Sequence, residues 1–173
     1  MKIKIFPLSS KISKKDLNYI ADMMFNHFNV KVVIDYKRYN YPHKDGMLNA
    51  EKALYDLRYG SRYCKYGEWL LGITKKKLAY KHHEKSNLRT LGLSYPMRSI
   101  FWDSNGMAIA SINKWDRDCM VKVCLHELGH SLGVIKHCKH KCVMRAIVSG
   151  KNSVERFCKT CANTIESNLK YLR

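Results

Sequence analysis

The segment His126–Met144, HELGHSLGVIKHCKHKCVM, concentrates side chains that bind metal ions. It contains four histidines, two cysteines and one glutamate. Imidazole and thiolate groups are preferred protein ligands of Zn²⁺, and a carboxylate can act as a base beside the ion. The composition of this segment therefore predicts metal binding, and its two ligand types leave open whether there is one site or two.

The first five residues, HELGH, have the spacing expected of a catalytic zinc site. His126 and His130 are four residues apart, so on a helix both imidazoles project from one face and can bind one ion. Glu127 lies beside them and can act as general base. Gly133 can end the helix and turn the chain, which makes His137 the candidate third ligand. The alternative is a helix with two surface histidines.

The cysteines point to a second site. The chain has seven, an odd number, and no leader that would send it to an oxidising compartment, so a disulfide framework is a poor explanation. The last four form a C-x3-C and a C-x2-C pair, a spacing typical of structural zinc: Cys138, Cys142, Cys158 and Cys161. The alternative is that they are small buried hydrophobes. We interpret the other three as buried thiols: Cys64, Cys119 and Cys124.

The charge of the chain allows several partners. Its 32 Lys and Arg residues against 14 Asp and Glu give a formal net charge of +18, which would attract nucleic acid, acidic lipid or acidic substrates. The densest runs are at 75–77 and 81–85, but the lysines are scattered, which favours a solvated basic surface. Four thiolates around one Zn²⁺ would add a local charge of −2 that the formal count omits.

The length of the chain and its N-terminal segment limit the possible domain organisation and location. At 173 residues the chain predicts a single domain, and no run of 18 apolar residues would span a membrane. The N-terminus, MKIKIFPLSS, is interpreted as a strand and not as a signal peptide. We therefore expect a cytoplasmic protein, and we expect it to be a monomer.

The elements that must position these residues alternate between strands and helices. Period-two patterns predict strands at 2–8, 30–36, 68–74, 90–96, 99–104 and 107–114. Helices are predicted at 13–29, with Ser13 and Asp16 as a capping box, at 50–60 after the N-cap Asn49, and from Asp116 into the metal-rich segment. The apolar face of the first helix is predicted as Leu17, Ile20, Ala21, Met24, Phe25 and Phe28. Residues 75–89 are interpreted as a long basic loop, Asn105–Gly106 as a hairpin turn, and the C-terminal part as irregular.

The combined motifs resemble those of the archaemetzincins, small zinc peptidases of the metzincin clan. The signature of that family is HExxHxxG, a third histidine followed directly by a cysteine, then C-x-M and a later CxxC. The chain has HELGHSLG, His137–Cys138, CVM at 142–144 and CKTC at 158–161. LNAEKALYDL, WLLGIT and LGLSYP look like the family's middle segments, so the resemblance covers most of the chain.

The resemblance implies a role for each matching residue. His126, His130 and His137 would bind a catalytic zinc, with Glu127 as general base and acid. A second, structural zinc would be bound by Cys138, Cys142, Cys158 and Cys161, and Met144 would form the methionine turn beneath the catalytic site. The implied fold class is α/β (α+β), a metzincin-like zincin domain. It has a twisted mixed sheet with packed helices, the HExxH helix among them, over about 1–133, and a small zinc-stabilised C-terminal part over about 134–173.

The chain departs from the family pattern next to the third histidine. The family has two residues between the glycine and that histidine, whereas this chain has three: Val134, Ile135 and Lys136. Lys136 therefore occupies the usual ligand position, and we expect a one-residue bulge to bring His137 back to the metal. His140 is a spare donor nearby.

These observations predict a zinc-dependent peptidase that uses Glu127 as general base on a peptide or protein substrate. In the metzincin plan the substrate lies extended along an edge strand, for which the hairpin 99–113 is the predicted source. The alternative is a non-catalytic zinc-binding module, in which the cysteine zinc stabilises the fold and the basic surface binds nucleic acid or an acidic partner.

Overall fold

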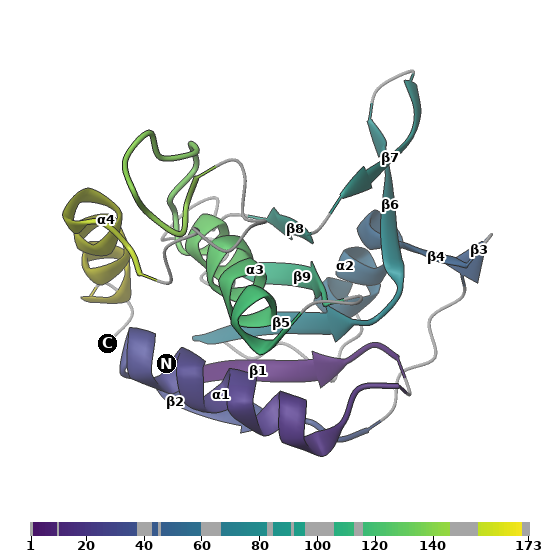
Figure 1. Ribbon diagram of the computed structural model, residues 1–173, viewed down its shortest axis with the longest axis horizontal. Coiled ribbons are helices and arrows are strands. Elements are labelled where there is room, and N and C mark those ends of the chain that lie inside the picture. Colours follow the sequence, from purple (N-terminus) through teal and green to yellow (C-terminus); the bar gives the residue numbers. More distant parts are fainter. Residues whose placement is uncertain are drawn as a thin grey trace.

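A computed structural model describes most of the chain (Figure 1). The described residues are 2–9, 11–37, 43–44, 46–59, 67–82, 85–90, 92–95, 106–112, 116–145 and 156–170. The predicted strand at 99–104, the turn at 105–106 apart from Gly106, and Cys64 lie outside them. Within the described part, no helix is long and apolar enough to cross a membrane.

The centre of the molecule is a five-stranded mixed sheet in the order β2-β1-β5-β9-β8. Its strands are β1 (Lys2–Pro7), β2 (Lys31–Ile34), β5 (Glu68–Thr74), β8 (Gly92–Tyr95) and β9 (Met107–Ser111). Four of them are parallel, and β8 pairs antiparallel with β9 at one edge, with Gly92 opposite Ala110. The predicted mixed sheet is thus confirmed. Among the described strands β8 lies at the edge and β9 lies inside the sheet; the first half of the hairpin predicted as the edge, 99–104, lies outside the described residues.

Both faces of this sheet are covered because its strands are apolar on both sides, as expected for buried parallel strands. Alternate residues such as Ile3, Ile5 and Leu71 face a core shared with α1 (Lys14–Phe28) and α3 (Arg117–Ser131). The intervening residues, such as Phe6 and Leu70, face a second core shared with α2 (Ala50–Tyr59). Figure 1 shows α3 lying across the sheet, which gives the HELGH helix a rigid support.

The caps predicted from the sequence set the ends of the helices. Ser13 Oγ accepts a hydrogen bond of 3.0 Å from the Asp16 N–H at the start of α1, and Asn49 Oδ1 accepts one of 2.9 Å from the Lys52 N–H at the start of α2. At the end of α1, Asn29 adopts a left-handed conformation with φ 48°. One residue of the predicted apolar face was wrong: Phe25 is 52% exposed. Phe25 lies at the margin of the apolar face of α1, whose buried positions include Met24 and Phe28.

The segment predicted as a long basic loop is instead a hairpin. β6 (Lys77–His82) pairs antiparallel with β7 (Lys85–Thr90), and these strands form a second sheet with β3 (His43–Lys44) and β4 (Met47–Asn49) in the order β3-β4-β6-β7. A high density of lysines favours a loop, but lysine is also common on exposed edge strands. Leu78 is fully buried and packs in the α2 core, which explains why this segment is ordered as a strand.

The C-terminal part, predicted to be irregular, ends in a helix, α4 (Lys159–Lys170). Cys161, Ile165 and Leu169 recur at every fourth residue and are buried against the core of α1 and α3. The Asn168 Nδ2 donates a hydrogen bond of 2.7 Å to the Leu132 carbonyl, directly after α3. The helix α4 therefore buries its apolar side chains against the core and also caps the C-terminal end of the HELGH helix with a hydrogen bond.

Candidate metal centres

The helix α3 positions the histidines from a fully buried support. Asp116 is its N-cap and accepts a hydrogen bond of 2.8 Å from the Cys119 N–H, which holds the pKa of that carboxyl below its usual value. Most of its side chains are buried, including those of His126 and Glu127. A helix packed on all sides cannot slide or rotate, so the orientation of HELGH is fixed by the core.

The structure brings three predicted ligands together at the end of α3. The ligand atoms of His126, His130 and His137 lie within 4.8 Å of one another. The rings of His126 and His137 are stacked with their centroids 5.2 Å apart, and the His130 ring meets the His126 ring edge-on. His126 is only 4% exposed whereas His137 is exposed, so the cluster is closed toward the core and open toward solvent.

Backbone carbonyls fix the tautomers of the two helical histidines. His126 Nδ1 lies 2.9 Å from the Val143 carbonyl, and His130 Nδ1 lies 2.6 Å from the Val134 carbonyl. A carbonyl only accepts, so each Nδ1 carries the proton and each Nε2 carries a lone pair. Sequence patterns cannot reveal these partners, because any residue type supplies a carbonyl at that position.

The two Nε2 atoms therefore face each other with lone pairs, at a distance of 3.1 Å. In this tautomer neither can donate to the other. Two nitrogens bound to one Zn²⁺ at about 2.0–2.1 Å with tetrahedral angles would be about 3.3 Å apart. Burial also lowers the pKa of His126 to about 4, with the neighbouring histidines contributing, so the ring is neutral as a ligand must be. The donors present fit a zinc ion.

The extra residue before His137 lies in solvent, as a bulge requires. Gly133 leaves α3 with φ 100°, and the Val134 N–H donates to the Gly129 carbonyl at 3.0 Å, which keeps Val134 in place under His130. Ile135 is then 74% exposed and Lys136 is exposed too. The loop thus presents His137 to the cluster without Lys136. His140 is exposed and is not part of the cluster.

Glu127 is held under the edge strand β8. It is 8% exposed, and a Cβ placed on Gly92 would overlap its carboxyl group, so the backbone of β8 passes directly over it. Burial raises the pKa of Glu127 to about 8, while a hydrogen bond from the Ser94 side chain opposes this shift. Sequence patterns do not single out Gly92 and Ser94, whose local signal is only the G-x-S spacing within a strand.

The four cysteines predicted to form the second site also converge. The sulfur atoms of Cys138, Cys142, Cys158 and Cys161 lie within 4.8 Å of one another. The Cys138 and Cys158 sulfurs are 3.6 Å apart, close to the value of about 3.8 Å for two thiolates on one tetrahedral Zn²⁺.

Backbone hydrogen bonds also favour thiolate in this cluster. The Cys158 N–H donates to the Cys142 sulfur at 3.2 Å. The hydrogen bond from the Cys161 backbone lowers the pKa of Cys158 to about 7, whereas burial raises the pKa of Cys142 and of Cys161.

The two clusters share one turn of the chain. Cys142 and Met144 flank Val143, whose carbonyl accepts from His126, and the Cys138 N–H donates to the Met144 carbonyl at 2.8 Å. Met144 is fully buried, and a Cβ on Gly129 would overlap its sulfur, so the glycine of HELGH makes room for it. The predicted place of Met144 beneath the histidines is thus consistent with its contacts.

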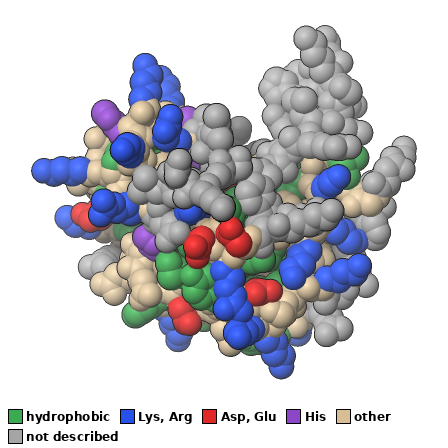
Figure 2. Space-filling view, in the orientation of Figure 1, with side chains coloured by type: hydrophobic (Ala, Val, Ile, Leu, Met, Phe, Trp, Pro, Cys, Tyr) green, Lys and Arg blue, Asp and Glu red, His purple; other side chains and the backbone are tan. Residues whose placement is uncertain are grey.

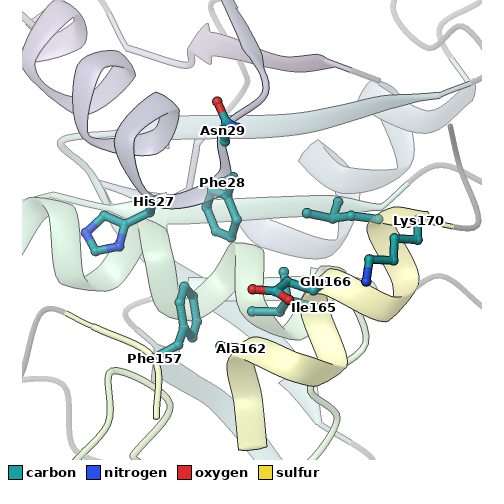
Figure 3. A pocket seen from close by; sticks show the side chains of 9 residues that line it. His27, Phe28, Asn29, Phe157, Ala162, Ile165, Glu166 and Lys170 are labelled. Carbon is teal, nitrogen blue, oxygen red and sulfur yellow. The ribbon is translucent and has the colours of Figure 1, made fainter. Parts of the chain in front are cut away.

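The other two described cysteines are not part of either cluster. Cys119 and Cys124 are buried on α3, as expected for thiols that pack as small hydrophobes, and burial raises the pKa of Cys124. A pocket of about 280 Å³ lies between the end of α1 and α4. Phe28, Phe157 and Ile165 line it (Figure 3), and it includes none of the clustered histidines or cysteines.

Known proteins match the chain along nearly its full length. An archaemetzincin of Archaeoglobus fulgidus is 29% identical over 173 aligned residues, which are 95% of this chain and 99% of that protein. No family model matches. The chain is thus similar to this archaemetzincin along nearly its whole length.

Solved structures share the fold of this chain. The crystal structure of the A. fulgidus archaemetzincin with malonate has a TM-score of 0.72 and 24% identity, covering 95% of this chain and 99% of that one. The archaemetzincin of Methanopyrus kandleri has a TM-score of 0.74 and 23% identity, covering 98% and 96%. A zinc-dependent peptidase of Methanocorpusculum labreanum has a TM-score of 0.70 and 19% identity, covering 94% and 99%. These likenesses confirm the predicted fold class.

Proposed function

We propose that this protein is a zinc metallopeptidase that hydrolyses peptide bonds at the histidine cluster. The class of enzyme follows from its relatives, an archaemetzincin and a zinc-dependent peptidase of the same fold. The observation that carries the proposal is the buried Glu127 beside three histidines whose ligand atoms lie within 4.8 Å of one another. We infer that His126, His130 and His137 hold the ion.

Zinc in such a site acidifies water and polarises the carbonyl that is attacked. The residues of the chain supply the rest. The carbonyls of Val143 and Val134 keep the Nε2 lone pairs of His126 and His130 directed at the ion. Glu127 accepts the proton of the attacking water and passes it to the leaving amine. Because a cation nearby favours the carboxylate, the pKa of Glu127, raised by burial, must fall when the ion is bound.

The edge strand β8 is the proposed binding surface for the substrate. Among the described strands it lies at the edge of the five-stranded sheet, on the side of α3, and the edge of a sheet is where an extended peptide can be added as a further strand. Gly92 and Ser94 on this strand also contact or approach the general base. The same strand would therefore align the substrate and hold the base.

We infer that the four clustered cysteines bind a second, structural zinc. Four thiolates leave no open coordination position, which is the arrangement of structural sites. The ion would hold the turn at Val143 against His126 and tie α4 to the loop after α3.

Peptide hydrolysis by variants of Glu127 tests the proposal. Glu127→Ala should remove hydrolysis of an unbiased peptide library by about 10²–10⁴-fold while both metals and the fold remain, because only the base is lost. Gly92→Ala should also reduce it, since the new methyl group displaces the carboxyl. Gly72→Ala is the matched control, because the new methyl group would crowd the core near Leu8, away from Glu127. Hydrolysis by Glu127→Ala at the wild-type rate would exclude the mechanism.

A further inference from the structure

The loops that carry the two clusters have an unbalanced positive charge. Residues 134–145 and 156–161 contain six cationic side chains and no acidic one: Lys136, Lys139, Lys141, Arg145, Arg156 and Lys159. All six are exposed. We call this set the basic rim. Figure 2 shows Lys, Arg and His side chains gathered at the upper left, over the end of the molecule that holds α4 and the loop after α3.

The basic rim begins at the candidate catalytic site. Lys136 is the neighbour of His137 in the sequence and Lys139 is two residues away, so their Cα atoms lie within about 7.6 Å of that of His137. The His137 ring is itself stacked on His126, at 5.2 Å between centroids. An extended peptide advances about 3.3 Å per residue. The rim lysines are therefore within reach of side chains two or three residues from a peptide bond held at the histidines.

Some cations elsewhere in the described part of the chain have acidic partners. Lys2 pairs with Glu68 at 2.7 Å, and Lys75 and Arg117 both lie 3.7 Å from Asp16. Within the same described residues, no salt bridge involves a member of the basic rim. The rim is thus a place where an external anion would find uncompensated charge.

Part of this charge has a structural explanation. Several rim residues are neighbours of the clustered cysteines in the sequence, and a zinc ion with four thiolates carries a charge of −2. Six cations against that charge leave a surplus of about four. Compensation of the structural ion therefore accounts for a minority of the rim.

We propose that the basic rim selects peptide substrates with acidic residues close to the scissile bond. This inference rests on the proposed function, since it assigns the substrate class of the same site. An acidic peptide fits better than nucleic acid because the rim borders the site where a peptide bond has to lie, and Lys136 flanks the exposed member of that cluster. Nucleic acid, which is attracted by the same charges, becomes an outcome of the test.

The test uses the full chain loaded with zinc and a series of octapeptides that differ in residues within three positions of the cleaved bond. These are Glu, Ala or Lys. We expect kcat/KM to be about ten-fold higher for the Glu peptides than for the Lys peptides, and the ratio to fall in 0.5 M salt, where the Debye length is only a few ångström. The variant Lys139→Glu/Lys141→Glu should reverse the preference.

The matched control is Lys11→Glu/Lys15→Glu, which makes the same change in net charge at exposed positions around the start of α1. Its preference should equal that of the wild type, because the rim is intact. Zinc content is measured for both variants, so that loss of metal is not mistaken for loss of selection. A Lys139→Glu/Lys141→Glu protein with the wild-type preference would overturn the proposal.

A binding assay separates this inference from the proposed function. The variant Glu127→Ala keeps the rim, and anisotropy with labelled Glu and Lys peptides measures selection without hydrolysis. If the wild type does not hydrolyse peptides but Glu127→Ala binds Glu peptides selectively, the proposed peptidase function is wrong and the selection of acidic peptides by the basic rim is retained. If the wild type hydrolyses Glu and Lys peptides equally well, only the proposal that the basic rim selects acidic substrates is wrong. If the double variant loses binding of a labelled single-stranded oligonucleotide but keeps its peptide preference, the partner is nucleic acid and the substrate proposal is wrong.

Discussion

The histidine cluster and the cysteine cluster lie on adjoining segments but are built differently. Two of the three histidines come from a single helix buried in the core, and the third, His137, is exposed. The four cysteines come from a loop and the start of α4, segments with little regular structure before that helix. A site with three donors, two of them on a buried helix, leaves a coordination position open for a substrate. A site with four donors, three of them outside regular structure, would instead use an ion to define the fold.

This difference indicates that the cysteine cluster helps to position the histidine cluster. The Val143 carbonyl, which sets the tautomer of His126, belongs to the turn between Cys142 and Met144. Asn168 on α4 closes the end of α3. The cysteine cluster therefore has consequences for the orientation of the histidines, whereas nothing in the contacts described requires the reverse.

The sharpest test of this asymmetry is Cys158→Ala. Loss of a thiolate should release the structural ion, destabilise the protein by more than about 3 kcal/mol and also weaken the histidine site. Thermal unfolding and metal content per chain measure the two effects. Cys119→Ala, a buried cysteine outside the clusters, should cost about 1 kcal/mol or less and lose no metal. Full metal content in Cys158→Ala would contradict the proposal that the four cysteines hold a metal ion.

The reverse effect is tested with His137→Ala. We expect the affinity of the histidine site for zinc to fall by more than about 100-fold, because two imidazoles remain, while the cysteine ion and the stability are retained. Competitive zinc titration with a chelator measures the affinity. His140→Ala is the control, since His140 is exposed outside the cluster. If the control lowers the affinity instead, the third ligand has been misassigned.

The histidine site should also respond to pH once its labile ion is removed. Glu127 keeps its proton up to about pH 8 in the folded protein but loses it near its ordinary pKa of 4.5 when unfolded, so stability falls as pH rises through this window. The lowered pKa of His126, about 4, acts in the opposite direction below pH 6.5. The window from pH 6.5 to 8 therefore isolates Glu127.

The corresponding measurement is thermal unfolding at several pH values in the protein that retains the cysteine ion. Between pH 6.5 and 8, Glu127→Gln should remove a pH dependence of about 1.5 kcal/mol, since each pH unit contributes at most about 1.4 kcal/mol and Glu127 is already partly ionised near pH 8. Glu166→Gln, an exposed change on α4, should leave the dependence intact. An identical slope in Glu127→Gln would contradict the assignment.

The smallest expected effect concerns the contact between α4 and α3. Asn168→Ala removes the hydrogen bond to the Leu132 carbonyl and should cost about 1 kcal/mol in chemical denaturation. Asn163→Ala changes an exposed asparagine on the same helix and should be close to neutral. Equal costs for the two variants would show that α4 is held by its apolar face alone.

Much of the fold was predictable because its signals are local. The caps at Ser13, Asn49 and Asp116 are hydrogen bonds within three residues, and the strand at 68–74 follows from its own composition. The convergence of the two donor sets was also predicted, since helix periodicity brings His126 and His130 together and the spacing pairs the cysteines. The errors fell where the composition misled, at the basic hairpin β6–β7, and where the pattern was short, at α4.

The sequence by itself determined the types of donor, the face of the helix that carries them and the residue able to act as base. Only the tertiary structure decided which strand covers Glu127, which carbonyls hold the imidazoles and which residues of the bulge face solvent. The single-domain organisation, the monomeric state and the cytoplasmic location stay predictions. The physical reason for the division is that side-chain chemistry and helical periodicity are written in neighbouring residues. A backbone carbonyl is the same in every residue, so its partner is set only by the packing of elements distant in the chain.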